Sequence, residues 1–546
     1  MWRLQSFRLR GNVISRQSPA RLLRRTMITD SILPPNEDDD HPPKSKDAHS
    51  KYHQAAFKVC ESAAVTFVSI AILGISGYMY HQYYQHQVLT KIRRAFAAGD
   101  RSLDLAMQSR TGEGEGAEGD GEGEREWVAR DEQDVINRAV SGQVAGRYYL
   151  LIGEKGTGKT SMLNHALRRV SALNCTMFEA HADPEIVRIR LGKAINYDYH
   201  EDYIGSLFSI RGPRDTTALL DIERALDKLE EVAVHEVKKT GRPLVLIVNS
   251  THLLREDEDG EKLVELLQQR AEGFAASGLV TMIFNSDDYW VYERFKKLST
   301  RLDVVTIRDL NREKSIEALR MWRRRYFDEP EVPKEVCDKV YNIVGGRPQF
   351  LNRVAQHRDM LGHAKSVVEK ERTWFLNQCG LLGMEMDDDV MESGKFSSSA
   401  MRLMKELVDM EQAERARQGD AAPDADHDLP SLPLWRARQV MTRADYIQKY
   451  DNLNIFTIDS NSMVRADSTA MMEAFRQIAA TPGFDKLLDD TLERVSQIES
   501  LGRTRELVAK DLVGGIGKYK ITIEKGGKGR ETIVVQAVPP REEDGR

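Results

Sequence analysis

The stretch that decides the fold is GEKGTGKT, residues 153–160. It fits the pattern G-x-x-x-x-G-K-[ST], follows the apolar run RYYLLI, and precedes SMLNHALRRV, which has the spacing of an amphipathic helix. A strand, a glycine-rich loop and a helix in this order form a cradle for phosphate, because successive backbone N–H groups point at one anion and the helix N-terminus adds its dipole. The stretch therefore predicts a phosphate-binding loop, or P-loop.

The residue types in this loop indicate a nucleotide with its metal ion. Lys159 would reach the β- and γ-phosphates, and the Thr160 hydroxyl would ligate Mg²⁺. We therefore expect ATP and Mg²⁺ as cofactors, although a P-loop does not read the base. A glycine turn without function is the alternative. The residues predicted to bind the nucleotide are Gly153, Glu154, Lys155, Gly156, Thr157, Gly158, Lys159, Thr160, Ser161 and, from a later segment, Arg347.

The sequence around the loop predicts a parallel sheet. Apolar runs of strand length, RYYLLIG, TMFEAHA, PLVLIVN, LVTMIFN and DVVTIRDL, alternate with amphipathic stretches. Strands that alternate with helices imply a parallel sheet covered by helices on both faces. We assign residues 127–310 to an α/β P-loop NTPase sandwich, and the helical segment 311–390 to a lid.

The C-terminal part reads as a second domain. In residues 391–500, helices followed by two short strands in NIFTIDSNSMVRAD predict a winged helix, which the polar insert QGDAAPDADHDLPSLP interrupts. Residues 501–546 form a tail in which KYKITIEKGGKGRETIVVQAV predicts a β-hairpin around a glycine-rich basic turn.

The N-terminus predicts an import signal and a membrane anchor. Residues 1–29 contain seven arginines and no acid, which is the mitochondrial presequence pattern; a basic disordered tail is the alternative. A polar segment, 30–61, follows. The uncharged run Ser62–Tyr80 is long enough to span a bilayer at about 1.5 Å per residue, so we predict a transmembrane helix at 62–82, with a buried core helix as the alternative. Together these features predict a single-pass protein of the mitochondrial inner membrane.

Residues 83–126 then read as a juxtamembrane helix and a linker. The linker is almost entirely glycine and acid in TGEGEGAEGDGEGE, residues 111–124. Such a segment buries nothing and its charges repel one another, so we expect a flexible spacer that lets a globular head stand off the bilayer. The four cysteines are scattered and form no CxxC pair, which argues against a zinc site or a disulfide framework.

Residues 127–382 resemble the AAA+ ATPases of the origin-recognition-like and archaeal STAND-type groups. The resemblance rests on RDEQ before the first strand, GEKGTGKTS, the strand LVLIVNSTHLL, the strand LVTMIFN, the stretch STRLDVVTIRDL and the GGRP turn in the lid. It implies nucleotide binding, a helical lid and a C-terminal winged helix. A homo-oligomer is what the alternative of an active remodelling ATPase would need.

One strand departs from the family pattern. LVLIVNSTHLL stands where the family places its Walker B strand, whose two acids assist Mg²⁺ and polarise the attacking water. Here the two positions are Asn249 and Ser250. An amide keeps a hydrogen-bonding oxygen but loses the charge, and a serine cannot act as a general base at neutral pH. Because phosphoryl transfer depends on positioning and electrostatics, binding is expected while hydrolysis is in doubt.

The resemblance suggests roles for three further residues. Asn285 ends the strand where the family has a sensor for the γ-phosphate, or it caps that strand. Arg301 stands where related proteins present an arginine to a neighbour's nucleotide, or it is a surface arginine. Arg347, in GGRP, stands where the lid touches the phosphates, unless the segment is a Gly-Pro turn that ends a helix.

The charge pattern favours protein over nucleic acid as the partner of the winged helix. The net charge is −6, and the predicted domain has Asp445, Asp451 and Asp459 beside few basic residues, which is a poor footprint for DNA. We therefore expect a nucleotide-dependent scaffold or switch. The alternatives are an active remodelling ATPase and a membrane tether that binds mitochondrial DNA through the winged helix.

Overall fold

The computed structural model describes residues 46–99, 127–199, 217–327, 332–418, 429–513, 518–526 and 530–538. The predicted presequence and the acidic linker lie outside the described residues. The chain divides into two compact units, Met1–Tyr78 and Met79–Arg546.

Helix α1, Lys46–Ala95, contains the predicted membrane span. Among the described residues it is the helix whose length and composition would allow it to cross a membrane. Its apolar side chains between Phe57 and Ile75 are exposed, as a lipid-facing surface would be.

The last turns of α1 belong to the second unit and enter its core. Ile92 and Phe96 are only 0% and 3% exposed and pack in the same cluster as the central sheet. The Asn174 amide donates to the Phe96 carbonyl at 2.9 Å, and Arg93 Nε lies 2.6 Å from a carboxylate oxygen of Glu236. The end of α1 therefore packs within the second unit.

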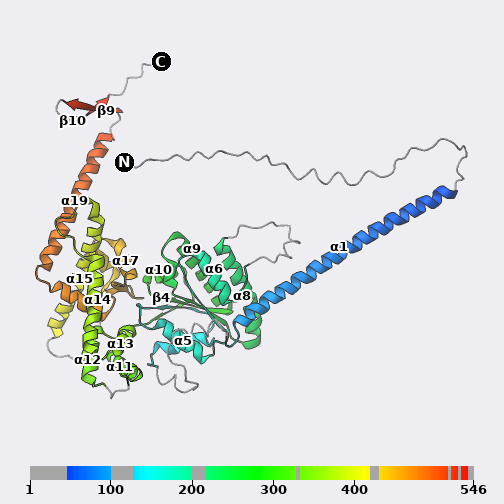
Figure 1. Cartoon of the computed structure of the whole chain (residues 1–546), viewed down its shortest axis with the longest axis horizontal. Coiled ribbons are helices and arrows are strands. Elements are labelled where there is room, and N and C mark those ends of the chain that lie inside the picture. Colours follow the sequence, from blue (N-terminus) through cyan, green and yellow to red (C-terminus); the bar gives the residue numbers. More distant parts are fainter. Residues whose placement is uncertain are drawn as a thin grey trace. The chain divides into compact units, whose positions relative to one another are not determined.

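A five-stranded parallel sheet is the centre of the second unit, as the alternating pattern predicted (Figure 1). Its order is β2-β3-β4-β1-β5, so β4 lies between the P-loop strand β1 and the strand β3. All the carboxyl ends consequently meet at one edge. The strands are β1 Tyr148–Ile152, β2 Cys175–Glu179, β3 Leu244–Asn249, β4 Val280–Ser286 and β5 Leu302–Thr306.

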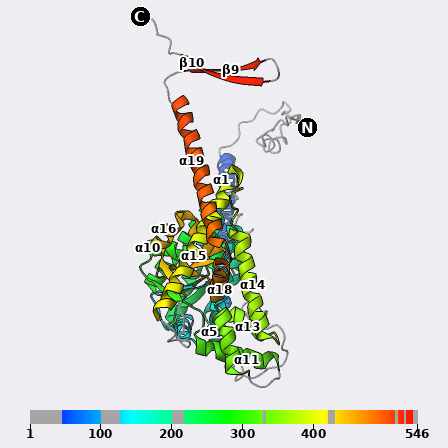
Figure 2. The same cartoon turned by 90° about the vertical axis from the view of Figure 1, so that its left-hand side faces the viewer.

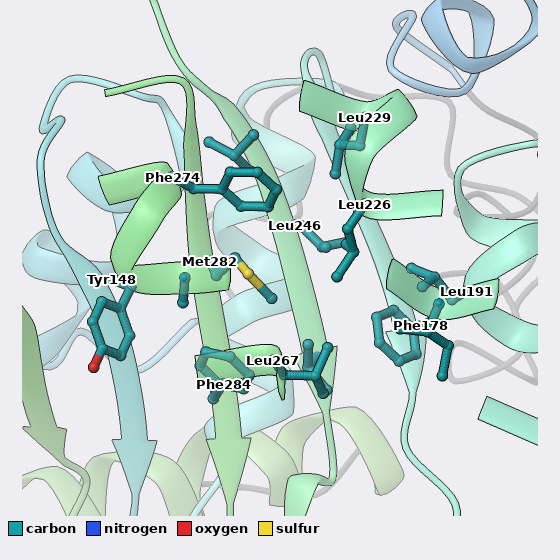
Figure 3. Packing of buried hydrophobic residues seen from close by; sticks show 14 of the residues in the cluster. Tyr148, Phe178, Leu191, Leu226, Leu229, Leu246, Leu267, Phe274, Met282 and Phe284 are labelled. Atoms are coloured by element: carbon teal, nitrogen blue, oxygen red, sulfur yellow. The ribbon is translucent and has the colours of Figure 1, made fainter. Parts of the chain in front are cut away.

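Helices cover both faces of the sheet because its strands are apolar on both sides. One face packs against α6, α8, α9 and α10, and Figure 3 shows Phe274 and Leu267 of α9 and Leu226 of α8 over Leu246 and Met282 of the sheet. The other face packs against α4 and α5 through the alternate residues of the same strands. The helices are α4 Glu132–Val140, α5 Lys159–Arg169, α6 Pro184–Ala194, α8 Ala218–Thr240, α9 Glu258–Ser277 and α10 Tyr289–Leu298.

The lid is helical, as predicted, and its apolar core also includes Ala470 and Ala474 of the later helix Thr469–Ala479. Buried residues such as Leu319 of α11 and Val340 of α12 build that core. The lid helices are α11 Arg312–Tyr326, α12 Lys334–Val344, α13 Pro348–Ala355 and α14 Met360–Cys379.

A winged helix follows the lid (Figure 2). Its three-stranded antiparallel sheet has the order β6-β8-β7, and the hairpin predicted in NIFTIDSNSMVRAD supplies β7 and β8. The third strand differs from expectation, because Ser431–Pro433 comes from the predicted polar insert and pairs with β8 through the buried Leu432. The elements are α15 Met391–Gln418, β6 Ser431–Pro433, α16 Leu434–Met441, α17 Ile447–Asn452, β7 Phe456–Ile458, β8 Met463–Ala466, α18 Thr469–Ala479 and α19 Phe484–Val513.

Three short 3₁₀ helices and a terminal hairpin complete the described chain. The hairpin predicted near the C-terminus is present as an antiparallel pair. These elements are η2 Thr251–Leu254, η3 Asp388–Val390, η5 Ala444–Tyr446, β9 Lys518–Gly526 and β10 Arg530–Val538.

Phe96 gives a test of the role of α1 in the core. Phe96→Ala should lower the free energy of unfolding by about 3–5 kcal/mol, because it leaves a cavity beside the sheet. Urea denaturation of the protein in detergent would measure this. Leu298→Ala, at a residue that is 55% exposed, is the control and should change the midpoint little. Equal midpoints for the Phe96 and Leu298 variants would contradict the packing.

Candidate functional site

The P-loop lies between β1 and α5 at the carboxyl edge of the sheet, as predicted. Gly156 and Gly158 have φ values of 85° and 96°, a region that side-chain-bearing residues rarely adopt. Lys159 Nζ donates to the carbonyl oxygens of Gly153 and Glu154 at 2.7 and 2.8 Å. The lysine is only 4% exposed, so its ammonium needs a counter-charge close by.

Asp287 supplies that counter-charge. Its carboxylate lies 2.8 Å from Lys159 Nζ, and its backbone N–H donates to His252 Nδ1 at 3.1 Å. Burial lowers the pKa of His252, which favours the neutral ring that accepts this bond. Our reading of the sequence missed Asp287, although two consecutive acids directly after the apolar run LVTMIFNS are the signal that could have found it.

Three polar side chains from different elements meet beside the P-loop. Asn285 Nδ2, at the end of β4, donates to Thr160 Oγ1 at 3.1 Å and to Asn249 Oδ1 at 2.6 Å. Thr160 Oγ1 also donates to Asn249 Oδ1 at 3.3 Å. Asn249 and Asn285 are each 2% exposed, and Asn285 Oδ1 is buried without a hydrogen-bond partner among the described residues. The site thus contains one buried acceptor that a bound group could satisfy.

Asn249 also reaches the neighbouring strand. Its Nδ2 donates to Glu179 Oε1 at 3.3 Å, and Glu179 is the residue opposite Asn249 in the β2–β3 register. The residue after Asn249, Ser250, has a φ of 55° and starts the turn into η2. The end of β3 is therefore polar but uncharged, and a carboxylate of β2 accepts a hydrogen bond from it.

These residues fit a nucleotide with Mg²⁺. The P-loop backbone and Lys159 would hold the phosphates, and the Thr160 hydroxyl would take a place in the coordination of Mg²⁺. The orphaned Asn285 oxygen could accept a hydrogen bond from a water ligand of the ion. Lys155 and Ser161 are exposed at the surface of the loop, whereas Thr157 is buried and its hydroxyl donates to the Glu154 carbonyl at 2.8 Å.

Arg347 lies in a buried ionic network. It is 1% exposed, its Nε lies 3.1 Å from Asp309 Oδ1, and its Nη1 and Nη2 donate to the side chain and the backbone carbonyl of Asp467. Burial alone would lower the pKa of Arg347, but the charges of Asp309 and Asp467 raise it, so the cation is retained. A phosphate would have to displace one of these carboxylates to reach the guanidinium predicted to contact it.

The winged helix and the lid both touch the P-loop. Arg465, on β8, donates to the Glu154 carboxylate, whose other oxygen lies 4.0 Å from Arg347 Nη2. The Gln349 backbone N–H, at the start of α13, donates to the Gly156 carbonyl at 3.3 Å. The Gln349 side chain lies so close to Gly156 that a Cβ there would be 2.3 Å from its Oε1. The loop is therefore held from outside by two further domains.

A second contact joins the winged helix to α10, the helix that follows the strand with Asn285. The Tyr289 backbone N–H, at the start of α10, donates to Asp451 Oδ2 at 2.8 Å, so a carboxylate of α17 caps a helix of the sheet domain. Burial raises the pKa of Asp288 to about 7, and the charges of Asp287 and Glu256 add to this shift. Burial also raises the pKa of Asp451 well above its usual range, with Asp288 as the next cause.

Arg301 lies away from this group. It directly precedes β5, and its carbonyl oxygen accepts from the backbone N–H of Tyr148, the first residue of β1. Arg301 therefore lies at the amino edge of the sheet, opposite the P-loop edge. Its side chain is 45% exposed and 3.9 Å from Glu272. Any contact of Arg301 with a nucleotide would therefore have to be with that of another molecule.

Comparison with known families gives two matches. Residues 126–282 match the AAA ATPase domain, and residues 377–499 match the C-terminal winged helix domain of fungal AAA proteins. No curated protein matches the chain.

Three archaeal proteins are among the solved structures that match. A Walker-type ATPase of Pyrococcus abyssi is 14% identical with a TM-score of 0.41, and the match covers 64% of this chain and 97% of that one. Cdc6p of Pyrobaculum aerophilum is 10% identical with a TM-score of 0.31, covering 64% and 95%. The Orc1 protein of Aeropyrum pernix, solved in complex with DNA, is 14% identical with a TM-score of 0.32, covering 63% and 90%.

The two family matches carry the assignment, since they cover the P-loop, the strands β1 to β3 and the winged helix. They agree with the sheet order and with the three-stranded wing described above. The chain therefore combines an AAA ATPase domain with a C-terminal winged helix domain of the fungal AAA type.

Proposed function

We propose that this protein is a membrane-anchored switch that binds ATP and Mg²⁺ and changes the docking of its winged helix in response. The observation that carries the proposal is the contact between Arg465 of the wing and Glu154 inside the P-loop. A wing residue that pairs with the phosphate-binding loop links the position of the winged helix to the occupancy of that loop.

Lys159 provides a route from the nucleotide to the winged helix. A bound phosphate would draw the lysine from Asp287, since both compete for the same ammonium. Asp287 is followed by Asp288 and then by Tyr289, whose amide is capped by Asp451 of the winged helix. Movement of Lys159 away from Asp287 would therefore disturb the hydrogen bond between the Tyr289 amide and Asp451, which is the second contact of the winged helix with the sheet domain. This differential contact is what a ligand needs in order to shift a conformational equilibrium.

The released winged helix would present itself to a protein partner. Arg465 faces Glu154 and Arg347 faces Asp467 and Asp309, so two arginines near the wing are used within the chain. This supports a protein partner more than DNA, which would need exposed cations. The DNA complex of the Orc1 protein concerns that protein and keeps DNA binding as an alternative for this chain.

The location in the mitochondrial inner membrane is part of the proposal. It is supported by the seven arginines in the acid-free N-terminal segment and by the apolar part of α1. A remodelling ATPase that assembles as a homo-oligomer is the second candidate, and the exposed Arg301 is the observation that favours it.

Nucleotide binding is tested by Lys159→Ala. Loss of the phosphate-binding ammonium should weaken ATP affinity at least about tenfold, since an ionic hydrogen bond contributes roughly 1.5–3 kcal/mol. Binding of a fluorescent ATP analogue, with single-turnover hydrolysis in the same samples, measures both properties. Lys193→Ala, at an exposed lysine of α6, is the control and should bind like the wild type. Full affinity in the Lys159 variant would contradict the proposed site.

The docking of the wing is tested by Arg465→Ala. ATP–Mg²⁺ should raise amide hydrogen exchange in β7 and β8 of the wild type, and Arg465→Ala should show the raised exchange without nucleotide. Arg436→Ala, at an arginine of α16 that pairs only loosely with Glu406 at 3.8 Å, is the matched control. Exchange that nucleotide leaves unaltered in the wild type would rule out the switch.

The docking should also depend on pH. The folded-state pKa of Asp288, about 7, lies above the usual 3.8, so its stabilising contribution is full below about pH 4 and is lost as the pH rises through 7. We therefore expect the melting temperature to fall between about pH 4 and pH 7 and to level off above pH 7, and Asp288→Asn to flatten this fall. Thermal melting across this range would show it, with the exposed Asp489→Asn as the control. An unchanged slope in Asp288→Asn would assign the pH dependence to another group.

A further inference from the structure

The end of strand β3 has lost its negative charge, but a carboxylate stands beside it on β2. Glu179 is the last residue of β2 and lies opposite Asn249 in the parallel register. The contact between them joins Asn249 Nδ2 to Glu179 Oε1 at 3.3 Å. Arg190 Nη1 holds this strand end by donating to the carbonyl oxygens of Glu179 and Ala180 at 3.1 and 2.9 Å.

The two ends of the Asn249 amide have different partners. Its oxygen accepts from Thr160 Oγ1 and Asn285 Nδ2, and its NH₂ group donates to Glu179. An aspartate at 249 would have no proton to donate at neutral pH and would place a second negative charge against Glu179. Asparagine is therefore the residue that suits a neighbouring carboxylate. At this edge of the sheet, the last residue of β2 is therefore charged and the last residue of β3 is neutral.

We propose that Glu179 supplies the negative charge that holds Mg²⁺ at this site, through a water ligand of an ion bound at Thr160. The inference rests on the proposed binding of ATP and Mg²⁺ and deepens it by naming the carboxylate. Mg²⁺ gives up its waters reluctantly and is usually held by one or two carboxylates together with phosphates, often through those waters. Glu179 is exposed at the strand end, so a hydrated ion would have access to it.

A second observation points to a ligand at the same place. Asn285 donates to Thr160 and Asn249 through Nδ2, while Oδ1 of the same amide is buried and has no hydrogen-bond partner among the described residues. A water bound to the ion would satisfy this acceptor. Hydrogen bonds through Asn249 thus connect three groups: the Thr160 hydroxyl, the Asn285 amide and the Glu179 carboxylate.

Three acids that follow β3 or β4 in the sequence have other partners. Among the described residues, the Asp287 carboxylate contacts Lys159 at 2.8 Å and His252 at 3.8 Å, whereas Glu179 contacts Asn249. Asp257 caps α9 by accepting from the Gly260 amide at 2.8 Å, and Glu258 pairs with Lys262 at 2.6 Å. Glu179 is therefore the carboxylate that contacts the polar cluster around Thr160.

The test compares nucleotide affinity with and without Mg²⁺ in the full chain, reconstituted in detergent. A fluorescent ATP analogue is titrated in EDTA and then in millimolar Mg²⁺. For the wild type we expect Mg²⁺ to tighten binding. In Glu179→Gln the gain from Mg²⁺ should fall by about 10- to 100-fold, the usual loss when an outer ligand of a metal is removed, while affinity in EDTA stays unchanged.

Two further variants make the result specific. Glu185→Gln, at an acid of α6 that pairs with Arg188, is the matched control and should keep the full effect of Mg²⁺. The double variant Asn249→Asp/Glu179→Gln returns the charge to β3 and should recover most of the effect. This recovery would not follow from a merely structural role of Glu179.

The remaining outcomes separate the two proposals. Full Mg²⁺ dependence in Glu179→Gln, or an equal loss of affinity in EDTA, would overturn the role of Glu179. A wild-type protein that binds the analogue but shows no gain from Mg²⁺ would overturn it as well. A wild-type protein that binds no analogue would instead overturn the proposed function on which this inference rests.

Discussion

The buried guanidinium of Arg347 is the interaction on which the arrangement of the second unit depends. A charge that is 1% exposed is tolerated only with partners of opposite charge, and each of its partners comes from a different segment. Asp309 follows the last strand of the sheet, Asp467 follows the wing, and Glu154 is in the P-loop. Separating the winged helix from the lid would remove Asp467 and leave the guanidinium with Asp309 and the more distant Glu154. The three segments are therefore coupled by an electrostatic requirement as well as by contact area.

The ionisation of the carboxylates around Arg347 matters to this network as much as the arginine does. Burial raises the pKa of Asp467 to about 6, even though Arg347 works in the opposite direction. The network therefore contains more negative charge than one guanidinium neutralises, and Arg465 brings a second cation to Glu154. A nucleotide would add further negative charge at the neighbouring P-loop. The balance between the loop, the lid and the wing is thus sensitive to occupancy for a general electrostatic reason.

The sequence predicted the parts of this fold that have local signals. The P-loop, the alternating strands, the lid and the wing hairpin each follow from spacing within a short stretch, and all are present. The packing of Ile92 and Phe96 could not be predicted, because they continue a helix whose apolar character already has a membrane explanation. Neither could the third strand at Ser431–Pro433, because its pairing with β8 depends on residues that are distant in the sequence.

The same distinction explains what was found and missed at the site. Thr160 was expected from the P-loop motif, Asn249 and Asn285 from their positions at strand ends, and the structure brings the three together. Asp287 was missed although it had a local signal directly after an apolar strand, whereas Arg465 and Glu179 were missed because their significance comes from which strand or domain lies beside them. Strand order decides this, since β2 next to β3 places Glu179 against Asn249. An acid missing from one position in a sequence is therefore weak evidence that the charge is missing from the site, because a parallel sheet brings the ends of neighbouring strands to the same edge.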